Sequence, residues 1–210
     1  MKVRVGIMLN EAVKPFEMIA GDVSLDLVNT LDFRFRESGA EELLGSYDDL
    51  LRFMTQSGLL SGAEAQGLDG VDAERGQVLE QVKELREALA GVLYAGVGGE
   101  EAVAAHVSLL EGYFKQASCR RRLMARGSRL VWSWEEVRGT VAAPLWLLAQ
   151  AAADLMVSER IGQLRTCSAD ACRWLFLDTS KNHSRRWCDM KVCGNRMKAR
   201  RFQARQMTAK

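Results

Sequence analysis

Cysteine is the residue whose spacing in this sequence points most directly to chemistry. Four of the five cysteines form two matched pairs, with four residues inside each pair and fifteen between the pairs: Cys167, Cys172, Cys188 and Cys193. Two such pairs can form two knuckles whose thiolates converge on one Zn²⁺. Four protein ligands leave no open position for water or substrate, so the pattern predicts a structural metal and not a catalytic one.

Other interpretations of the cysteines stay open at this point. Disulfides would suit an exported protein, and four thiolates could also hold an iron–sulfur cluster. His183 is the nearest rival zinc ligand, but it lies in the polar run TSKNHSRR, which favours a surface or loop-bracing role. Cys119 lies far from both pairs, and we expect it to be a buried or strand-edge thiol.

Positive charge is concentrated around and after the second cysteine pair. Residues 161–210 carry 12 Lys/Arg against 3 Asp/Glu, a charge of +9, whereas residues 1–160 carry −7 and the whole chain +2. Strong helix formers after Gly194 predict a basic helix from Asn195 to about Met207. The residues predicted to contact nucleic acid are Lys181, Arg185, Arg186, Arg196, Lys198, Arg200, Arg201 and Arg205.

A zinc module that presents a cationic helix can neutralise phosphates and release counterions, and arginine can also bind guanine edges in a major groove. The alternatives are a solvated basic tail and a patch that pairs with the acidic remainder of the chain.

The segment of about fifty residues that holds the paired cysteines has few apolar side chains and should need metal to fold. Its apolar residues are expected to pack in the core, although aromatic rings can also stack on bases. They are Trp174, Leu175, Phe176, Leu177 and Trp187.

Apolar spacing predicts a mainly helical domain before the cysteines, with helices inside 21–37, 45–60, 71–95, 100–117 and 133–160. In the last range, Ser133 and Glu136 suggest a capping box, and Pro144 should start or kink the main segment. Short runs on either side of Gly127 predict a β-hairpin. Residues 2–9 alternate like a strand or an extended arm.

The expected fold is therefore mainly α with a small β-hairpin: a helical domain over 1–160 and a zinc module, treble-clef-like or knuckle-type, over 161–210. No apolar run is long enough to span a membrane and no signal peptide is evident, so we expect a cytoplasmic protein with reduced thiols. A phosphate-binding loop and a serine elbow are absent, and the two histidines are isolated, so we do not expect an enzyme.

The segment from Cys167 to Arg201 closely resembles the CGNR zinc finger, a bacterial module named for the tetrapeptide found here at residues 193–196. The flanking LFLD, SRRWCDM and KARR are similar to that family as well. GDVSLDLVNTL, DLLRFMTQSGLL and LREAL resemble ABATE, a mainly helical domain that precedes this finger in proteins described as stress-induced transcription regulators. The resemblance covers most of residues 20–205 and implies that the four paired cysteines are the ligands of one Zn²⁺.

These observations together predict a zinc-dependent protein that binds duplex DNA and regulates transcription. Its N-terminal domain would either form a homodimer or bind a small-molecule effector. The alternative is a zinc-braced module that binds RNA or another protein. Polar residues beside the first helix could line an effector pocket, or could equally be caps and surface ion pairs. They are Asp22, Asp26, Asn29, Asp32 and Arg34.

Overall fold

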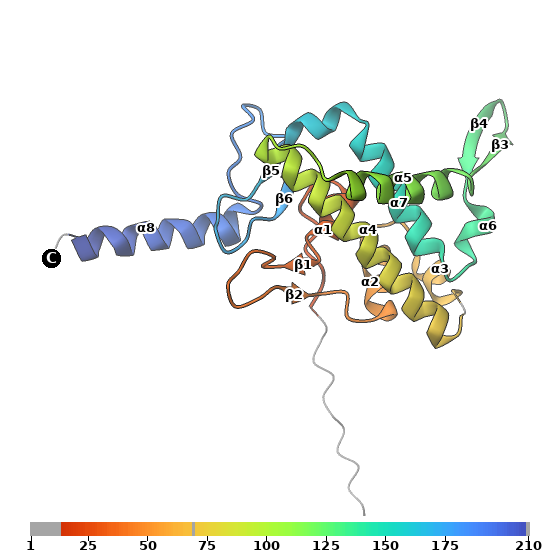
Figure 1. Ribbon diagram of the computed structural model, residues 1–210, viewed down its shortest axis with the longest axis horizontal. Coiled ribbons are helices and arrows are strands. Elements are labelled where there is room, and N and C mark those ends of the chain that lie inside the picture. The colour runs from red at the N-terminus through yellow and green to blue at the C-terminus, as the bar shows by residue number, and fades with distance from the viewer. Residues whose placement is uncertain (1–13, 69, 209–210) are drawn as a thin grey trace, which may run out of the picture.

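Three helices with apolar stripes form the centre of the computed structural model, which describes residues 14–68 and 70–208. α4 (Asp72–Gly98) packs against α5 (Ala104–Ser118) and α7 (Ala143–Met156), and these two also pack against each other (Figure 1). α4 buries Val78, Val82, Leu85 and Leu89 along one side. α7 is buried on nearly every side because almost all of its residues are apolar. Pro144 lies in its first turn and starts it, as predicted.

Shorter elements precede these helices in the chain. They are α1 (Val23–Val28), the antiparallel strands β1 (Leu31–Asp32) and β2 (Glu41–Glu42), α2 (Tyr47–Gln56) and α3 (Gly62–Gln66). Two of them, α1 and α2, pack against both α4 and α7. Ser46 caps α2 by accepting a hydrogen bond from the backbone of Asp49. α1 is shorter than predicted, because Asn29 is its C-cap and the chain then enters β1.

The predicted hairpin is present as β3 (Arg122–Arg126) and β4 (Arg129–Ser133), which project from the end of the helical layer (Figure 1). α6 (Glu135–Arg138) follows. Ser133 pairs with Arg122 in the hairpin, and α6 begins at Glu135 with Trp134 as its N-cap and no side-chain cap bond. The predicted capping box of Ser133 with Glu136 stays a prediction, because the Glu136 side chain lies outside the described residues. Cys119 is not buried, because it is the C-cap of α5, before the hairpin, and faces solvent.

The cysteine-containing part, here called the finger (residues 161–208), follows the body (residues 14–160). It contains the end of the 3₁₀ turn η1 (Glu159–Gln163), the antiparallel strands β5 (Leu164–Thr166) and β6 (Leu175–Leu177), the π-helical turn η2 (Met190–Gly194) and the helix α8 (Asn195–Thr208). α8 extends away from the remainder of the molecule in Figure 1. This helix was predicted, and its bounds agree within one residue at the C-terminal end.

The finger shares its core with the body through β6. Leu175, Phe176 and Leu177 are buried in the same apolar cluster as the body helices. The backbone of Leu177 donates to Ala20, and the two ends of the Asn29 side chain hold both backbone polar groups of Leu175, at 2.9 and 3.0 Å. This confirms that the apolar residues around the first knuckle are core residues, and it fixes the finger's strands on α1.

The predicted arm at residues 2–9 lies outside the part of the chain that the structure describes. Within the described part, the helices are too short or too polar to cross a membrane.

Candidate metal centre and nucleic-acid interface

The four paired cysteines converge into one buried cluster. All of their Sγ atoms lie within 4.8 Å of one another, and Cys188 lies 3.6 Å from both Cys172 and Cys193. A disulfide would require about 2.05 Å, whereas sulfurs bound tetrahedrally to zinc at about 2.3 Å lie about 3.8 Å apart. The cluster therefore has the spacing of a four-thiolate zinc site and not of disulfides.

The first cysteine pair is positioned by the turn between β5 and β6. Cys167 directly follows β5 and donates its backbone N–H to Trp174 at 2.8 Å. The backbone of Cys172 donates to Ala169 at 2.8 Å, and Arg173 takes a left-handed conformation (φ +59°) that closes the turn. These bonds direct both thiols to the same side of the hairpin.

The second cysteine pair surrounds the N-terminal turn that leads into α8. The Asp189 side chain accepts from the backbone of Val192 at 2.8 Å, and the Asp189 carbonyl accepts from Gly194. Gly194 is required by packing, since a Cβ there would lie 2.4 Å from Sδ of Met190 and 3.2 Å from Cδ1 of Trp187. One cysteine pair on a hairpin and one at a helix start is the treble-clef-like alternative of the two predicted arrangements.

Contacts among the clustered thiols shift their pKa values in opposite directions. Hydrogen bonds from the Cys172 and Cys188 thiols lower the pKa of Cys167 below its ordinary value. The contact with Cys167, together with that with Cys172 and burial, raises the pKa of Cys188 above its ordinary value. A divalent cation is needed to hold all four groups as thiolates. The donor set, its burial and its spacing fit one structural Zn²⁺ with no open coordination position.

His183 is not part of the cluster. It is exposed, with φ +46°, and its Nδ1 lies 2.9 Å from the carbonyl oxygen of Asp178. The same Asp178 is buried and accepts hydrogen bonds from Ser180 and from the backbone of Arg185. These bonds lower the pKa of Asp178, mainly through the Ser180 hydroxyl. Sequence reasoning overlooked Asp178, although an aspartate just after an apolar strand and two residues before a serine is a turn signal.

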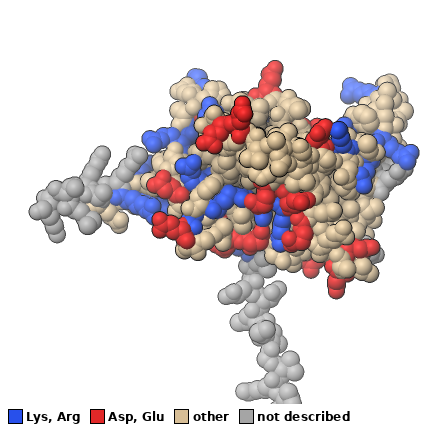
Figure 2. Space-filling view, viewed as in Figure 1, with Lys and Arg blue, Asp and Glu red and all other residues tan. Residues whose placement is uncertain are grey.

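The predicted nucleic-acid-binding residues fall into three groups. Lys181, Arg186, Arg196, Lys198 and Arg200 are exposed, and basic side chains are visible where α8 leaves the body (Figure 2). The side chains of Arg201 and Arg205 lie outside the described residues. Arg185 instead braces the finger: it donates to the carbonyls of Trp187 and Cys188, and its guanidinium lies over the ring of Phe176 at 4.4 Å.

The polar residues predicted to line an effector pocket are mostly engaged in structural contacts. Asp22 caps α1 and pairs with Arg160 at 2.8 Å, while Asn29 holds β6. Asp26 accepts from the backbone of Ile19 and Ala20, and Arg34 pairs with Glu87. Only Asp32 of the five lines the cavity of about 440 Å³ that lies between the body and the finger.

Two family models match the chain. The model of ABATE, described as "Putative stress-induced transcription regulator", matches residues 21–159. The model of the CGNR zinc finger matches residues 163–206, which include all four clustered cysteines. Neither of these is a family of enzymes. No curated protein matches the chain.

Proposed function

Because the chain belongs to the ABATE family and ends in a CGNR zinc finger, we propose that it is a transcription regulator that binds duplex DNA through α8. The observation that carries this proposal is the placement of that helix. α8 has no acidic residue, extends away from the body, and makes its main contacts with η2 (Figure 1). A helix so basic and so little covered suits a polyanionic partner.

The metal gives this helix a fixed direction. Cys193 lies in η2, which runs directly into α8, and Asp189 caps the same turn. A Zn²⁺ bound to Cys193 and to the hairpin cysteines would therefore join the helix start to β5 and β6, which are packed on the body. The finger would present α8 to DNA as a rigid element, so little ordering would be needed on binding.

Contact with phosphates is the proposed role of the exposed basic side chains. Arg196 and Arg200 are four residues apart and so lie on one face of α8. Within residues 14–68 and 70–208, no acidic group forms an ion pair with Arg196, Lys198 or Arg200. This favours an external polyanion over pairing with the acidic body. Lys181 and Arg186 would add contacts from the neighbouring loop.

Binding of the zinc-loaded protein to duplex DNA over a series of salt concentrations tests the proposal. Replacing Arg196 and Arg200 together by alanine should make the plot of log K against log salt shallower by about 2, since each phosphate contact contributes about 0.9. The matched control is Lys83→Ala with Lys115→Ala. It removes the same charge from α4 and α5, where each lysine pairs with a glutamate of its own helix.

The control variant should retain the wild-type slope. Equal slopes in the two variants would contradict the assignment of α8 as the contact surface. Tighter binding of single-stranded RNA than of duplex DNA would instead favour an RNA-binding module.

A further inference from the structure

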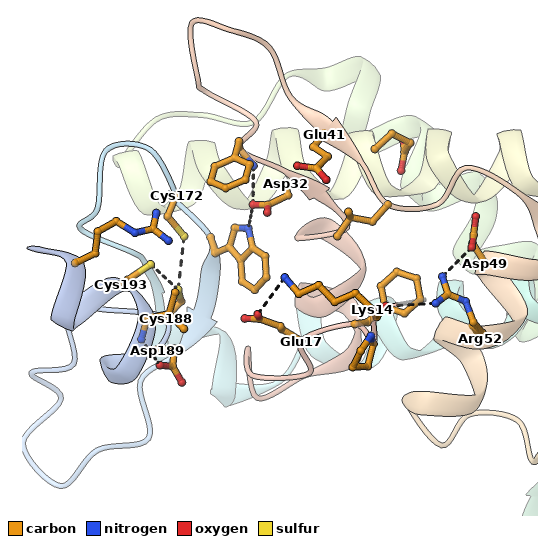
Figure 3. Close-up of a pocket in the computed structure, with 18 residues that line it drawn as sticks. Lys14, Glu17, Asp32, Glu41, Asp49, Arg52, Cys172, Cys188, Asp189 and Cys193 are labelled. Atoms are coloured by element: carbon orange, nitrogen blue, oxygen red, sulfur yellow. Dashed lines mark hydrogen bonds and ion pairs between the residues drawn. The ribbon is translucent and has the colours of Figure 1, made fainter. Parts of the chain in front are cut away.

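The cavity between the body and the finger has the size and lining of a small-molecule site. Its volume is about 440 Å³, within the range typical of ligand pockets. The body contributes residues 14–17, β1, β2 and α2, and the finger contributes Trp174, three of the clustered cysteines and the start of α8 (Figure 3). A molecule bound there would touch both halves of the protein.

Aromatic side chains provide the apolar part of the lining. Trp174 is nearly buried, and its indole N–H donates to Oδ1 of Asp32 at 2.7 Å, which fixes the orientation of the ring. Phe16 and Phe33 also line the cavity. Phe33 has φ +51°, a conformation that bulky residues seldom adopt and that often marks a functional site.

Negative charge dominates the polar part of the lining. Six carboxylates and three cationic side chains face the cavity, and three of the carboxylates have a cationic partner. Glu42 pairs with Arg86 and Asp49 with Arg52, each at 2.7 Å, and Glu17 pairs with Lys14 at 3.8 Å. Among the described residues, the other three, Asp32, Glu41 and Asp189, have no cation within ion-pair distance, and Asp189 instead accepts from the backbone of Val192.

Asp32 and Glu41 are also direct cross-strand partners in the β1–β2 pair. Side chains in that relation share one face of the strand pair, and like charges placed there destabilise it. Both carboxylates lie on the same side of the cavity in Figure 3. On the finger side, Cys172, Cys188 and Cys193 form part of the wall, and four thiolates around one divalent ion leave that wall negative.

We propose that this cavity binds a small organic cation with an aromatic body, such as an aromatic amine. Its ammonium group would lie between Asp32 and Glu41 and relieve their repulsion, and its ring would pack against Trp174 and Phe33. Arg196, a first-turn residue of α8, also lines the cavity. Binding would therefore be linked to the packing of the finger and to the DNA-contacting helix. This last consequence rests on the proposed function, whereas the binding itself does not.

Isothermal titration of the zinc-loaded full-length protein with tryptamine tests the site, with indole-3-acetate as the anionic counterpart. We expect one equivalent of tryptamine to bind with a Kd below roughly 1 mM, and no measurable binding of indole-3-acetate. Asp32→Asn with Glu41→Gln should weaken tryptamine binding at least about tenfold. Asn at position 32 keeps an oxygen that can accept from Trp174, so the fold should persist.

Two further variants guard against a folding defect. Glu41→Gln alone changes an exposed side chain and should still weaken binding measurably, with zinc content and circular dichroism unchanged. Glu80→Gln with Glu111→Gln removes the same charge from α4 and α5 and should leave the Kd unchanged. The proposal is overturned if tryptamine does not bind at about 10 mM, or if indole-3-acetate binds as tightly as tryptamine. It is also overturned if the Asp32/Glu41 double variant and the Glu80/Glu111 double variant bind tryptamine with equal affinity. Tryptamine binding without any DNA binding would contradict the proposed function alone.

Discussion

Cys188 lies at the centre of the thiol cluster, in contact with Cys172 and Cys193 at 3.6 Å each. We predict that Cys188→Ser weakens zinc binding by several orders of magnitude, because a serine hydroxyl does not replace a thiolate ligand. The second knuckle and the start of α8 should lose order, while the body helices persist. Zinc content after dialysis and far-ultraviolet circular dichroism measure the two effects.

Cys119→Ser is the matched control for this variant, because Cys119 is an exposed thiol outside the cluster. It should retain one equivalent of zinc. Tight retention of zinc by Cys188→Ser would rule out the four-thiolate assignment.

Asn29 holds the finger to α1 by bonds to both backbone groups of Leu175. Asn29→Ala should lower the free energy of unfolding by about 2–4 kcal/mol, since it leaves two buried backbone groups without partners. Asn182→Ala, an exposed loop change, should stay within about 0.5 kcal/mol of wild type. Urea unfolding of the two zinc-loaded variants measures these effects. If Asn29→Ala destabilised the protein as little as Asn182→Ala, the Asn29 side chain would not hold the finger to α1.

Asp26 makes stability depend on pH in a predictable direction. Burial raises its pKa from 3.8 to about 6 in the folded protein. The folded state therefore holds the Asp26 proton more tightly than the unfolded state does. The stabilisation that this proton provides is fully present below pH 3.8 and is lost as the pH rises through 6. As the pH rises from 4 to 7, the free energy of unfolding of Asp26→Asn should increase by about 2–3 kcal/mol relative to that of the wild type.

Urea unfolding of both proteins at several pH values in this range measures that difference. Protonation of the zinc ligands at low pH affects the two proteins alike and cancels in the comparison. A constant difference between variant and wild type across the range would contradict the role of Asp26.

Single residues differ in how far the sequence could predict their roles. The zinc ligands were predictable because metal binding depends on residue type and local spacing. The sequence alone suggests a pocket residue at Asn29, because its actual partner, Leu175, lies 146 positions away along the chain. Arg185 was grouped with the phosphate contacts by charge, whereas its guanidinium faces carbonyls that only the folded finger brings near.

At the scale of elements, the turn before α8 depends on a glycine. Gly194→Ala would place a Cβ 3.2 Å from Trp187 and even closer to Met190. Met190 can move because it is half exposed, but Trp187 packs on the core. We predict a loss of about 1–3 kcal/mol in the stability of the zinc-loaded protein, read as a lower thermal midpoint.

Gly112→Ala in α5 is the matched control, because a Cβ there meets no other atom within 4 Å. It should stabilise the protein by about 0.5–1 kcal/mol through helix propensity. Equal effects of the two substitutions would contradict the packing argument at Gly194.

Elements marked by local signals were predictable, including the β3–β4 hairpin around Gly127, whereas the residues at which the strands begin, end and pair were not. α2, α4, α5 and α8 follow from caps, periodicity and helix formers in their own segments. The end of α1 and the place of Ser133 depend on the register of short strand pairs, in which Leu31 pairs with Glu42 and Ser133 with Arg122. The β1–β2 pair itself has two residues in each strand and too little pattern to be detected.

At the scale of the whole molecule, residues 1–160 carry a net negative charge and residues 161–210 a net positive one, while the body and the finger share one apolar core. β6 anchors the finger on α1, α8 extends from it, and an acidic and aromatic cavity lies where the two halves meet. A ligand in that cavity would therefore contact both the body and the start of α8, the helix proposed to contact DNA. This arrangement would couple the binding of a small molecule in the proposed site to the proposed binding of DNA by α8.

Fluorescence anisotropy of a labelled random-sequence duplex at low salt tests whether zinc positions α8 for DNA binding. The titration is made with the zinc-loaded protein, with the protein after chelation, and with the chelated protein after zinc is restored. We predict binding by the loaded protein, loss of binding on chelation and recovery with zinc, because the metal positions α8. Absence of binding by the loaded protein, or unchanged binding after chelation, would contradict it.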